Sequence, residues 1–234
     1  MNDQARRQIL ASIRNNLAVS APFDRMYSES NSHVQGGPAA LSTISEFAEA
    51  TESLVDLFRE NLEIVDGHCV VVPDEARARG ALREIISSLG ETDSGLRRIV
   101  LSDVPIVNRL ADILADNVEY VSAVDDVGKL FTCDVGITSA QLAIAETGTL
   151  VLDASKEQHR LASLLPPVHI AIISSSQICL TLGEALAAIH ANGSEISSTV
   201  TFITGPSRTA DIELTLAIGV HGPQKLYVLV ITGT

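Results

Sequence analysis

Residues 133–152 hold the densest group of side chains that could do chemistry. Within this stretch, Glu146, Thr147, Gly148 and Thr149 stand between two apolar runs. A glycine bend lets backbone N–H groups approach a ligand, and a carboxylate beside the bend can point into a cleft. Partial burial would raise the pKa of Glu146 and suit it to acid/base or nucleophilic work. A turn with a solvated glutamate explains the same spacing and stays open as the alternative.

A second group is TFITGPSRTADIE at residues 201–213, which predicts a strand that leads into a helix at 209–217. Free N–H groups at a helix start bind anions, and Arg208 could hold a carboxylate or phosphate through two hydrogen bonds. Plain capping of the helix by Ser207 or Thr209 is the alternative. Capping accounts for these residues by itself, and ligand binding would be added to it.

Three further positions carry polar groups near expected strand ends. Arg160 has a functional interpretation, because a lone arginine that faces a cleft favours carboxylate substrates. His169 follows two prolines at the start of an expected strand, and we expect it to be structural. We expect His221, which lies between two glycines, to be exposed, and whether it reaches the same edge of the sheet as Ser207 stays open.

The elements that must position these residues alternate along the chain. Strands are expected at 69–72, 98–101, 118–121, 133–138, 148–152, 168–173, 199–204 and 226–231, and helices at 44–62, 75–89, 106–115, 157–164, 181–191 and 209–217. Apolar strands that alternate with helices predict one α/β domain over 44–234, with helices on both faces of a mostly parallel sheet. Such a sheet binds ligands at the carboxyl ends of its strands. Residues 1–43 predict an N-terminal helix and a flexible linker.

Composition excludes several classes of protein. Sixteen Lys and Arg against 29 Asp and Glu give a net charge of −13, so we expect no nucleic-acid partner. No apolar run is long enough for a membrane span, and we expect a soluble, cytoplasmic protein. The three cysteines are dispersed and form no C-x-x-C, so we expect no cofactor on this chain, neither an iron–sulfur cluster nor a structural zinc. Dinucleotide, Walker, zinc-hydrolase and serine-hydrolase motifs are absent from the sequence.

Three ordered motifs carry a resemblance to a known family. The chain is similar to the lactate-utilization protein C group of the LUD-domain family over about residues 45–231. The motifs that carry this similarity are, in order, DVGIT…AIAETGTLVL, HRLASLLPPVHI and GPSRTADIELTLAIGVHGP. The resemblance implies a fold like that of sugar-phosphate isomerases and coenzyme A transferases. It also implies a component of a bacterial multi-subunit system that oxidises L-lactate to pyruvate, with the iron–sulfur clusters on partner proteins.

The resemblance leaves two alternative functions open. Coenzyme A transferases of this fold use a Glu in an E-x-G setting as the nucleophile, and Glu146 resembles it. A free-standing acyl transferase-like or sugar-phosphate isomerase-like enzyme is therefore one alternative, and a non-catalytic regulatory or scaffold subunit is another.

For the lactate system, we expect Arg208 or Arg160 to bind the carboxylate of a small ligand such as lactate. Glu146 would handle a proton, and backbone N–H groups near Ser207 would hold an anion. This site requires the bend at Gly148 and the loop at Ser207 to open onto a common pocket. Whether the chain forms a homodimer stays open.

Overall fold

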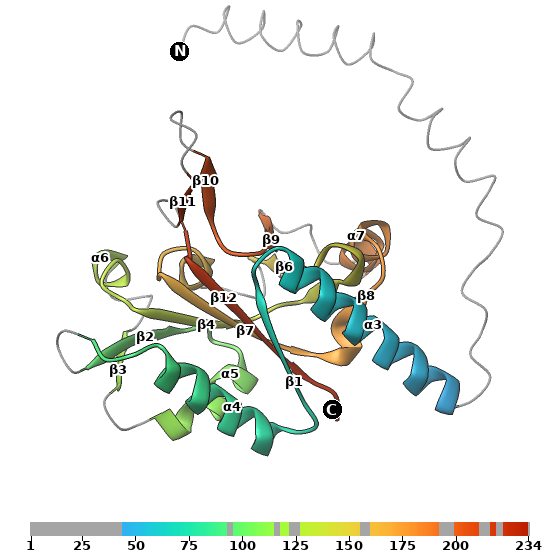
Figure 1. Ribbon diagram of the computed structural model, residues 1–234, viewed down its shortest axis with the longest axis horizontal. Helices are drawn as coiled ribbons and strands as arrows, with labels where there is room; N and C mark the ends of the chain where they lie inside the picture. The colour runs from blue at the N-terminus through green and yellow to red at the C-terminus, as the bar shows by residue number, and fades with distance from the viewer. Residues whose placement is uncertain are drawn as a thin grey trace, which may run out of the picture. The chain divides into compact units, whose positions relative to one another are not determined.

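The computed structural model describes residues 44–92, 96–114, 118–121, 127–154, 160–191, 199–210, 216–218 and 222–233 of the 234-residue chain. The chain divides into two compact units, Met1–Phe47 and Ala48–Thr234. The expected N-terminal helix and linker lie outside the described residues, and the boundary at residue 43 stays a prediction. The second unit carries the sheets and helices that position the candidate site (Figure 1).

A six-stranded sheet with only parallel pairs forms the centre of the second unit, in the order β1-β12-β7-β4-β2-β3. Its strands are β1 (His68–Val72), β2 (Arg97–Leu101), β3 (Val118–Val121), β4 (Val135–Ser139), β7 (Val168–Ser174) and β12 (Lys225–Ile231). The central strands are apolar on both faces, as expected for strands that are covered on both sides. All six were expected from the sequence, within two residues at their ends.

Helices cover both faces of this sheet (Figure 1). On one face lie α4 (Glu75–Ser88) and α5 (Pro105–Ala111), and on the other lies α3 (Ile44–Ile64). In α4 the buried residues Ala78, Leu82 and Ile85 recur every three or four positions. Asp74 caps this helix by accepting a hydrogen bond from the backbone N–H of Arg77 at 2.7 Å. The predicted α/β fold with a mostly parallel sheet is confirmed.

A second, four-stranded sheet was not expected. It has the order β8-β5-β6-β9 and comprises β5 (Leu142–Ile144), β6 (Thr149–Asp153), β8 (Ile178–Cys179) and β9 (Val200–Thr204). The prediction of a single sheet is therefore wrong for residues 148–152 and 199–204. The segment between β4 and β6 is shorter than the dozen or so residues that a parallel crossover needs, so the chain turns back on itself. One face of this sheet packs toward α3, and the other packs against α7 (Leu182–Ala191).

The helix expected at 209–217 is also wrong. The structure has an antiparallel pair there, β10 (Arg208–Ala210) with β11 (Leu216–Ile218), which Figure 1 shows as two short neighbouring strands. Residues 211–215 lie outside the described part of the chain. Apolar residues recur at every second position from Ala210 to Ile218, and this period of two is typical of a strand.

The remaining elements are short and connect the sheets. They are η1 (Asp112–Leu114), α6 (Val127–Leu130), η2 (Ala145–Thr147), η3 (Arg160–Ser163) and η4 (Ser175–Gln177). The helices expected at 44–62, 75–89, 106–115 and 181–191 are confirmed. Of the helix expected at 157–164, only the 3-10 turn η3 and Leu164 are described. No helix in the described part of the chain is both long and apolar enough to cross a bilayer.

Candidate functional site

The bend at Gly148 is held in a left-handed conformation against the end of α3. Gly148 has a φ of 61°, and a Cβ at this position would lie 2.4 Å from the backbone nitrogen of Leu62. Asn61 fixes the same contact, because its Nδ2 donates to the carbonyl of Ala145 at 2.8 Å. Only glycine satisfies both the backbone angle and the close approach. The bend therefore has a structural reason to contain glycine.

Glu146 lies on the surface, next to the start of α7. Its Oε1 accepts a hydrogen bond from the backbone N–H of Leu182 at 3.1 Å, and its own N–H donates to the carbonyl of Leu180. The side chain is exposed, so the partial burial that would suit Glu146 to acid/base or nucleophilic work is not observed. A carboxylate at a helix N-terminus stabilises the helix. Glu146 thus has a capping role, which resembles the simpler alternative considered for it.

The loop that follows β9 runs into a strand and not into a helix. Gly205 has a φ of 77° and packs on Val65, while the N–H of Ser207 donates to the carbonyl of Pro223 at 2.7 Å. Arg208 forms an ion pair with Asp66, and both side chains are exposed. The helix start expected to provide an anion site is therefore wrong, because the described residues Arg208–Ala210 form the strand β10, and ligand binding by Ser207 and Arg208 stays a prediction.

Three other predicted positions cannot be compared with the structure. The side chains of Arg160 and Thr209 and the whole of His221 lie outside the described residues. Their proposed roles in ligand binding stay predictions.

A chain of three threonine hydroxyls joins the two predicted segments. Thr149 and Thr204 are direct partners in the antiparallel pair of β6 and β9. The Oγ1 of Thr149 lies 2.7 Å from the Oγ1 of Thr147 and 2.7 Å from the Oγ1 of Thr204. Thr149 is buried, whereas Thr147 and Thr204 are exposed at the two ends. The bend at Gly148 therefore lies beside the strand end that leads into the loop at Ser207.

This hydroxyl chain, Thr147–Thr149–Thr204, ends in two exposed threonines. A hydroxyl both donates and accepts hydrogen bonds, so the two exposed members can still contact a ligand. Arg208 follows Thr204 in the chain by one short turn, and its guanidinium pairs with Asp66. The sequence alone does not indicate Asn61, Asp66 or Thr204 as part of this site, because their partners are distant in the chain.

His169 is fully buried within the six-stranded sheet. Its Nε2 lies 2.9 Å from the hydroxyl of Thr138, and its Nδ1 has no hydrogen-bond partner in the described structure. Burial lowers the pKa of His169 to about 4, so the ring is neutral near pH 7. The expectation that this histidine is structural agrees with its place on β7, between Gly136 of β4 and Leu226 of β12.

We expect this histidine to make the protein sensitive to acid. Below about pH 6.5 the unfolded chain binds a proton that the folded chain does not bind, so stability falls as the pH drops toward 4. A shift in the pKa of His169 from 6.5 to about 4 corresponds to a loss of roughly 3 kcal/mol in the free energy of unfolding once the pH is below both values. Urea unfolding between pH 7.5 and 4.5 should show a flatter profile for His169→Gln than for the wild type. Parallel profiles would contradict this account.

Of the three cysteines, Cys133 is buried and Cys69 and Cys179 are half-buried. Burial raises the pKa of Cys69 to about 12 and that of Cys133 to about 11, and it also raises the pKa of Cys179. A metal ligand or a nucleophile must be a thiolate. Among the described residues, no group of three His, Cys, Asp or Glu side chains is placed to hold a metal ion.

Comparison with known proteins identifies the class to which this fold belongs. The family model described as LUD domain matches residues 55–231, and the chain belongs to this family. It is 35% identical to Lactate utilization protein C of Bacillus subtilis over 182 residues, which are 76% of this chain and 68% of that protein. It is 29% identical to the protein of the same name from Geobacillus thermodenitrificans, over 80% of this chain and 73% of the relative.

A solved structure agrees with the fold. The crystal structure of a DUF162 family protein from Deinococcus radiodurans matches with a TM-score of 0.58 and 26% identity, over 77% of this chain and 98% of that chain. The family predicted from the three sequence motifs is confirmed.

Proposed function

We propose that this chain is a component of a bacterial lactate utilization system that oxidises L-lactate to pyruvate. The observation that carries the proposal is the similarity to two proteins named Lactate utilization protein C over at least three quarters of the chain. The LUD domain match over residues 55–231 supports it. As part of the same proposal, the chain works in the cytoplasm.

The redox centres are assigned to partner proteins. Oxidation of lactate to pyruvate removes two electrons and two protons, and the electrons need an acceptor. We assign this acceptor to iron–sulfur partners, because the three cysteines of this chain are dispersed and form no C-x-x-C, whereas iron–sulfur clusters are held by clustered cysteine thiolates. This chain then contributes ligand binding or the organisation of the partners, and it carries no cofactor of its own.

In this proposal, a small carboxylate ligand such as lactate binds at the hydroxyl chain. Thr147 and Thr204 are exposed residues whose hydroxyls contact that of Thr149, and Arg208 lies near Thr204 in the sequence. The ion pair of Arg208 with Asp66 is exposed on both sides, and exposed pairs contribute only about 0–1 kcal/mol. Arg208 can therefore exchange Asp66 for a ligand carboxylate at little cost. Glu146 is less suited to acyl transfer, because its carboxylate accepts a hydrogen bond from the start of α7.

Deletion of the gene should abolish growth on L-lactate and leave growth on pyruvate unchanged. In the deletion strain, Arg208→Gln should restore lactate growth poorly, since a charge-assisted hydrogen bond contributes about 1.5–3 kcal/mol. Growth rates on the two carbon sources are the measurement. The matched control is Arg109→Gln, which removes an exposed arginine that pairs with Glu75 at 2.7 Å, on the opposite face of the sheet.

The possible outcomes separate the parts of the proposal. Normal lactate growth of the deletion strain would refute a required role in lactate utilization. Full complementation by both Arg208→Gln and Thr204→Val would refute ligand binding at the hydroxyl chain and favour a scaffold role.

A further inference from the structure

A pocket lined by none of the residues of the hydroxyl chain lies at one edge of the six-stranded sheet. It has a volume of about 390 Å³ and opens at the amino-terminal ends of β2, β4, β7 and β12, next to the turn that follows α4. Pockets for small molecules span about 300–1,000 Å³, so the volume of this one lies at the lower end of that range. The general rule for parallel sheets places ligands at the opposite, carboxyl ends. The position of this pocket is therefore not explained by the topology.

Four charged side chains line this amino-edge pocket, two of each sign. The cations are Arg97 and Lys225, and the anions are Glu91 and Asp134, while Leu89 and Val168 provide apolar surface. Among the described residues, no ion pair within 4 Å joins any two of these four groups. The pocket thus has no net charge, yet its charges do not neutralise one another directly.

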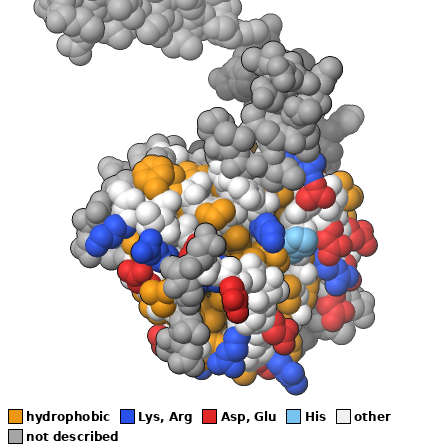
Figure 2. All heavy atoms as spheres, turned by 60° about the vertical axis from the view of Figure 1, so that its left-hand side comes forward, with side chains coloured by type: hydrophobic (Ala, Val, Ile, Leu, Met, Phe, Trp, Pro, Cys, Tyr) orange, Lys and Arg blue, Asp and Glu red, His pale blue; other side chains and the backbone are white. Residues whose placement is uncertain are grey.

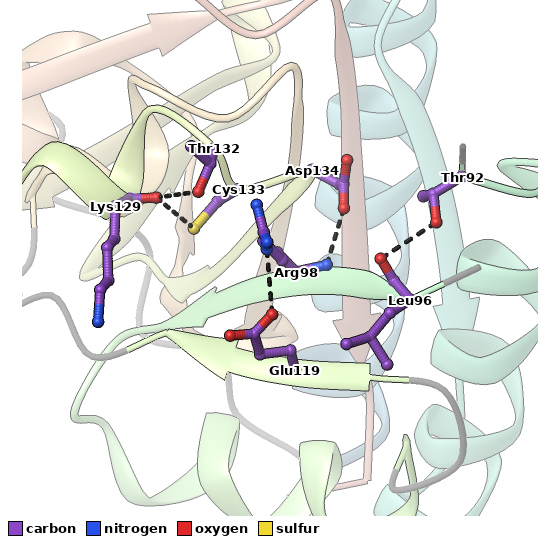
Figure 3. A network of polar contacts seen from close by, with 8 residues as sticks. All are labelled: Thr92, Leu96, Arg98, Glu119, Lys129, Thr132, Cys133 and Asp134. Atoms are coloured by element: carbon purple, nitrogen blue, oxygen red, sulfur yellow. Dashed lines mark hydrogen bonds and ion pairs between the residues drawn. The ribbon is translucent and has the colours of Figure 1, made fainter. Parts of the chain in front are cut away.

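The backbone around Asp134 is fixed. Its Oδ2 accepts the backbone N–H of Arg98 at 2.7 Å, and its own N–H donates to the carbonyl of Arg98 at 2.8 Å. The guanidinium of Arg98 turns away to Glu119, with its Nε 3.0 Å from Oε2 (Figure 3). Arg98 therefore positions the carboxylate of Asp134 but does not pair with it. The second oxygen of Asp134 can accept a hydrogen bond from a ligand.

The opposite wall is fixed through β12. The backbone N–H groups of Gln224 and Lys225 both donate to the carbonyl of Pro167, at 2.7 and 3.2 Å. The ammonium of Lys225 has no hydrogen-bond or ion-pair partner among the described residues. Figure 2 shows basic and acidic side chains interspersed on the face that it presents, without a broad field of one sign.

We propose that the amino-edge pocket binds a small zwitterion of the α-amino acid type. Lys225 and Arg97 bind its carboxylate, and Asp134 and Glu91 bind its ammonium. A zwitterion leaves the pocket neutral and pairs both signs of charge, whereas a simple carboxylate leaves both anions without a cation. The pocket shares no residue with the hydroxyl chain, so this inference is independent of the proposed function.

L-alanine and L-lactate test the proposal directly, because they differ only in an ammonium or a hydroxyl group on C2. Isothermal titration calorimetry and saturation-transfer NMR on the full chain should show that L-alanine binds at least about tenfold more tightly than L-lactate at this pocket. Lys225→Gln and Asp134→Asn should each weaken L-alanine binding at least about tenfold. Glu119→Gln is the matched control and should leave the affinity unchanged, because Glu119 belongs to the same network but does not line the pocket.

Several results would overturn the inference. These are no binding of L-alanine at millimolar concentration, equal binding of L-lactate, or unchanged affinity in Lys225→Gln. Circular dichroism checks that each variant is folded. Asp134 is held by the backbone of Arg98, so Asp134→Asn can affect folding. In that event Lys225→Gln decides, because its ammonium has no partner among the described residues.

Discussion

Replacing Gly136 with alanine should lower the free energy of unfolding by at least about 3 kcal/mol. A Cβ on this residue of β4 would lie 1.7 Å from the carbonyl oxygen of Ala162 and 2.8 Å from its carbonyl carbon. These are backbone atoms of η3, which crosses directly over the strand, so no side chain can rotate to make room. Either η3 must move away from the sheet or β4 must leave its register beside His169.

Urea or thermal unfolding measures this effect, and Gly80→Ala is the matched control. Gly80 lies inside α4, and a Cβ there would have nothing within 4 Å. The free energy of unfolding of Gly80→Ala should rise by about 0.5–1 kcal/mol, because alanine is favoured over glycine in a helix. A Gly136→Ala protein as stable as the wild type would mean that η3 does not lie on β4 as described.

Gly148→Ala should also be destabilised, by about 3 kcal/mol, for two separate reasons. The left-handed φ of 61° costs a residue with a Cβ about 1–2 kcal/mol. In addition, the new Cβ would lie 2.4 Å from the nitrogen of Leu62 and 2.6 Å from the carbonyl carbon of Asn61. Overpacking of this kind adds about 1–3 kcal/mol.

The two causes at Gly148 can be separated by a second site. Gly90 has a φ of 82°, but a Cβ there would have nothing within 4 Å. Gly90→Ala therefore measures only the free-energy cost of the left-handed backbone conformation. The free energy of unfolding should therefore be highest for the wild type, lower for Gly90→Ala and lowest for Gly148→Ala. If the two variants were equally stable, the bend at Gly148 would not contact α3.

Periodicity made most of the fold predictable. The recurrence of Ala78, Leu82 and Ile85 indicates a helix, and the apolar runs at residues 168–173 and 226–231 indicate buried strands. The second sheet was missed because its membership depends on where the chain turns back after β4. The hairpin after Arg208 was missed although the residues from Ala210 onward alternate with a period of two.

The candidate site was predictable only in part. The two predicted segments do lie side by side, since Thr149 pairs with Thr204 across β6 and β9. The exposure of Glu146 and the pairing of Arg208 with Asp66 were not predictable, because both depend on residues that are remote in the chain. The common pocket expected for these segments stays a prediction.

Lactate-dependent dye reduction by the reconstituted system tests the central proposal most directly. The chain would be purified together with the iron–sulfur proteins proposed as its partners, and reduction of an artificial electron acceptor would be followed with L-lactate as the donor. We expect rapid reduction by the complete mixture, almost none when this chain is left out, and recovery when it is added back. Equal rates with and without this chain would contradict a required role in lactate oxidation.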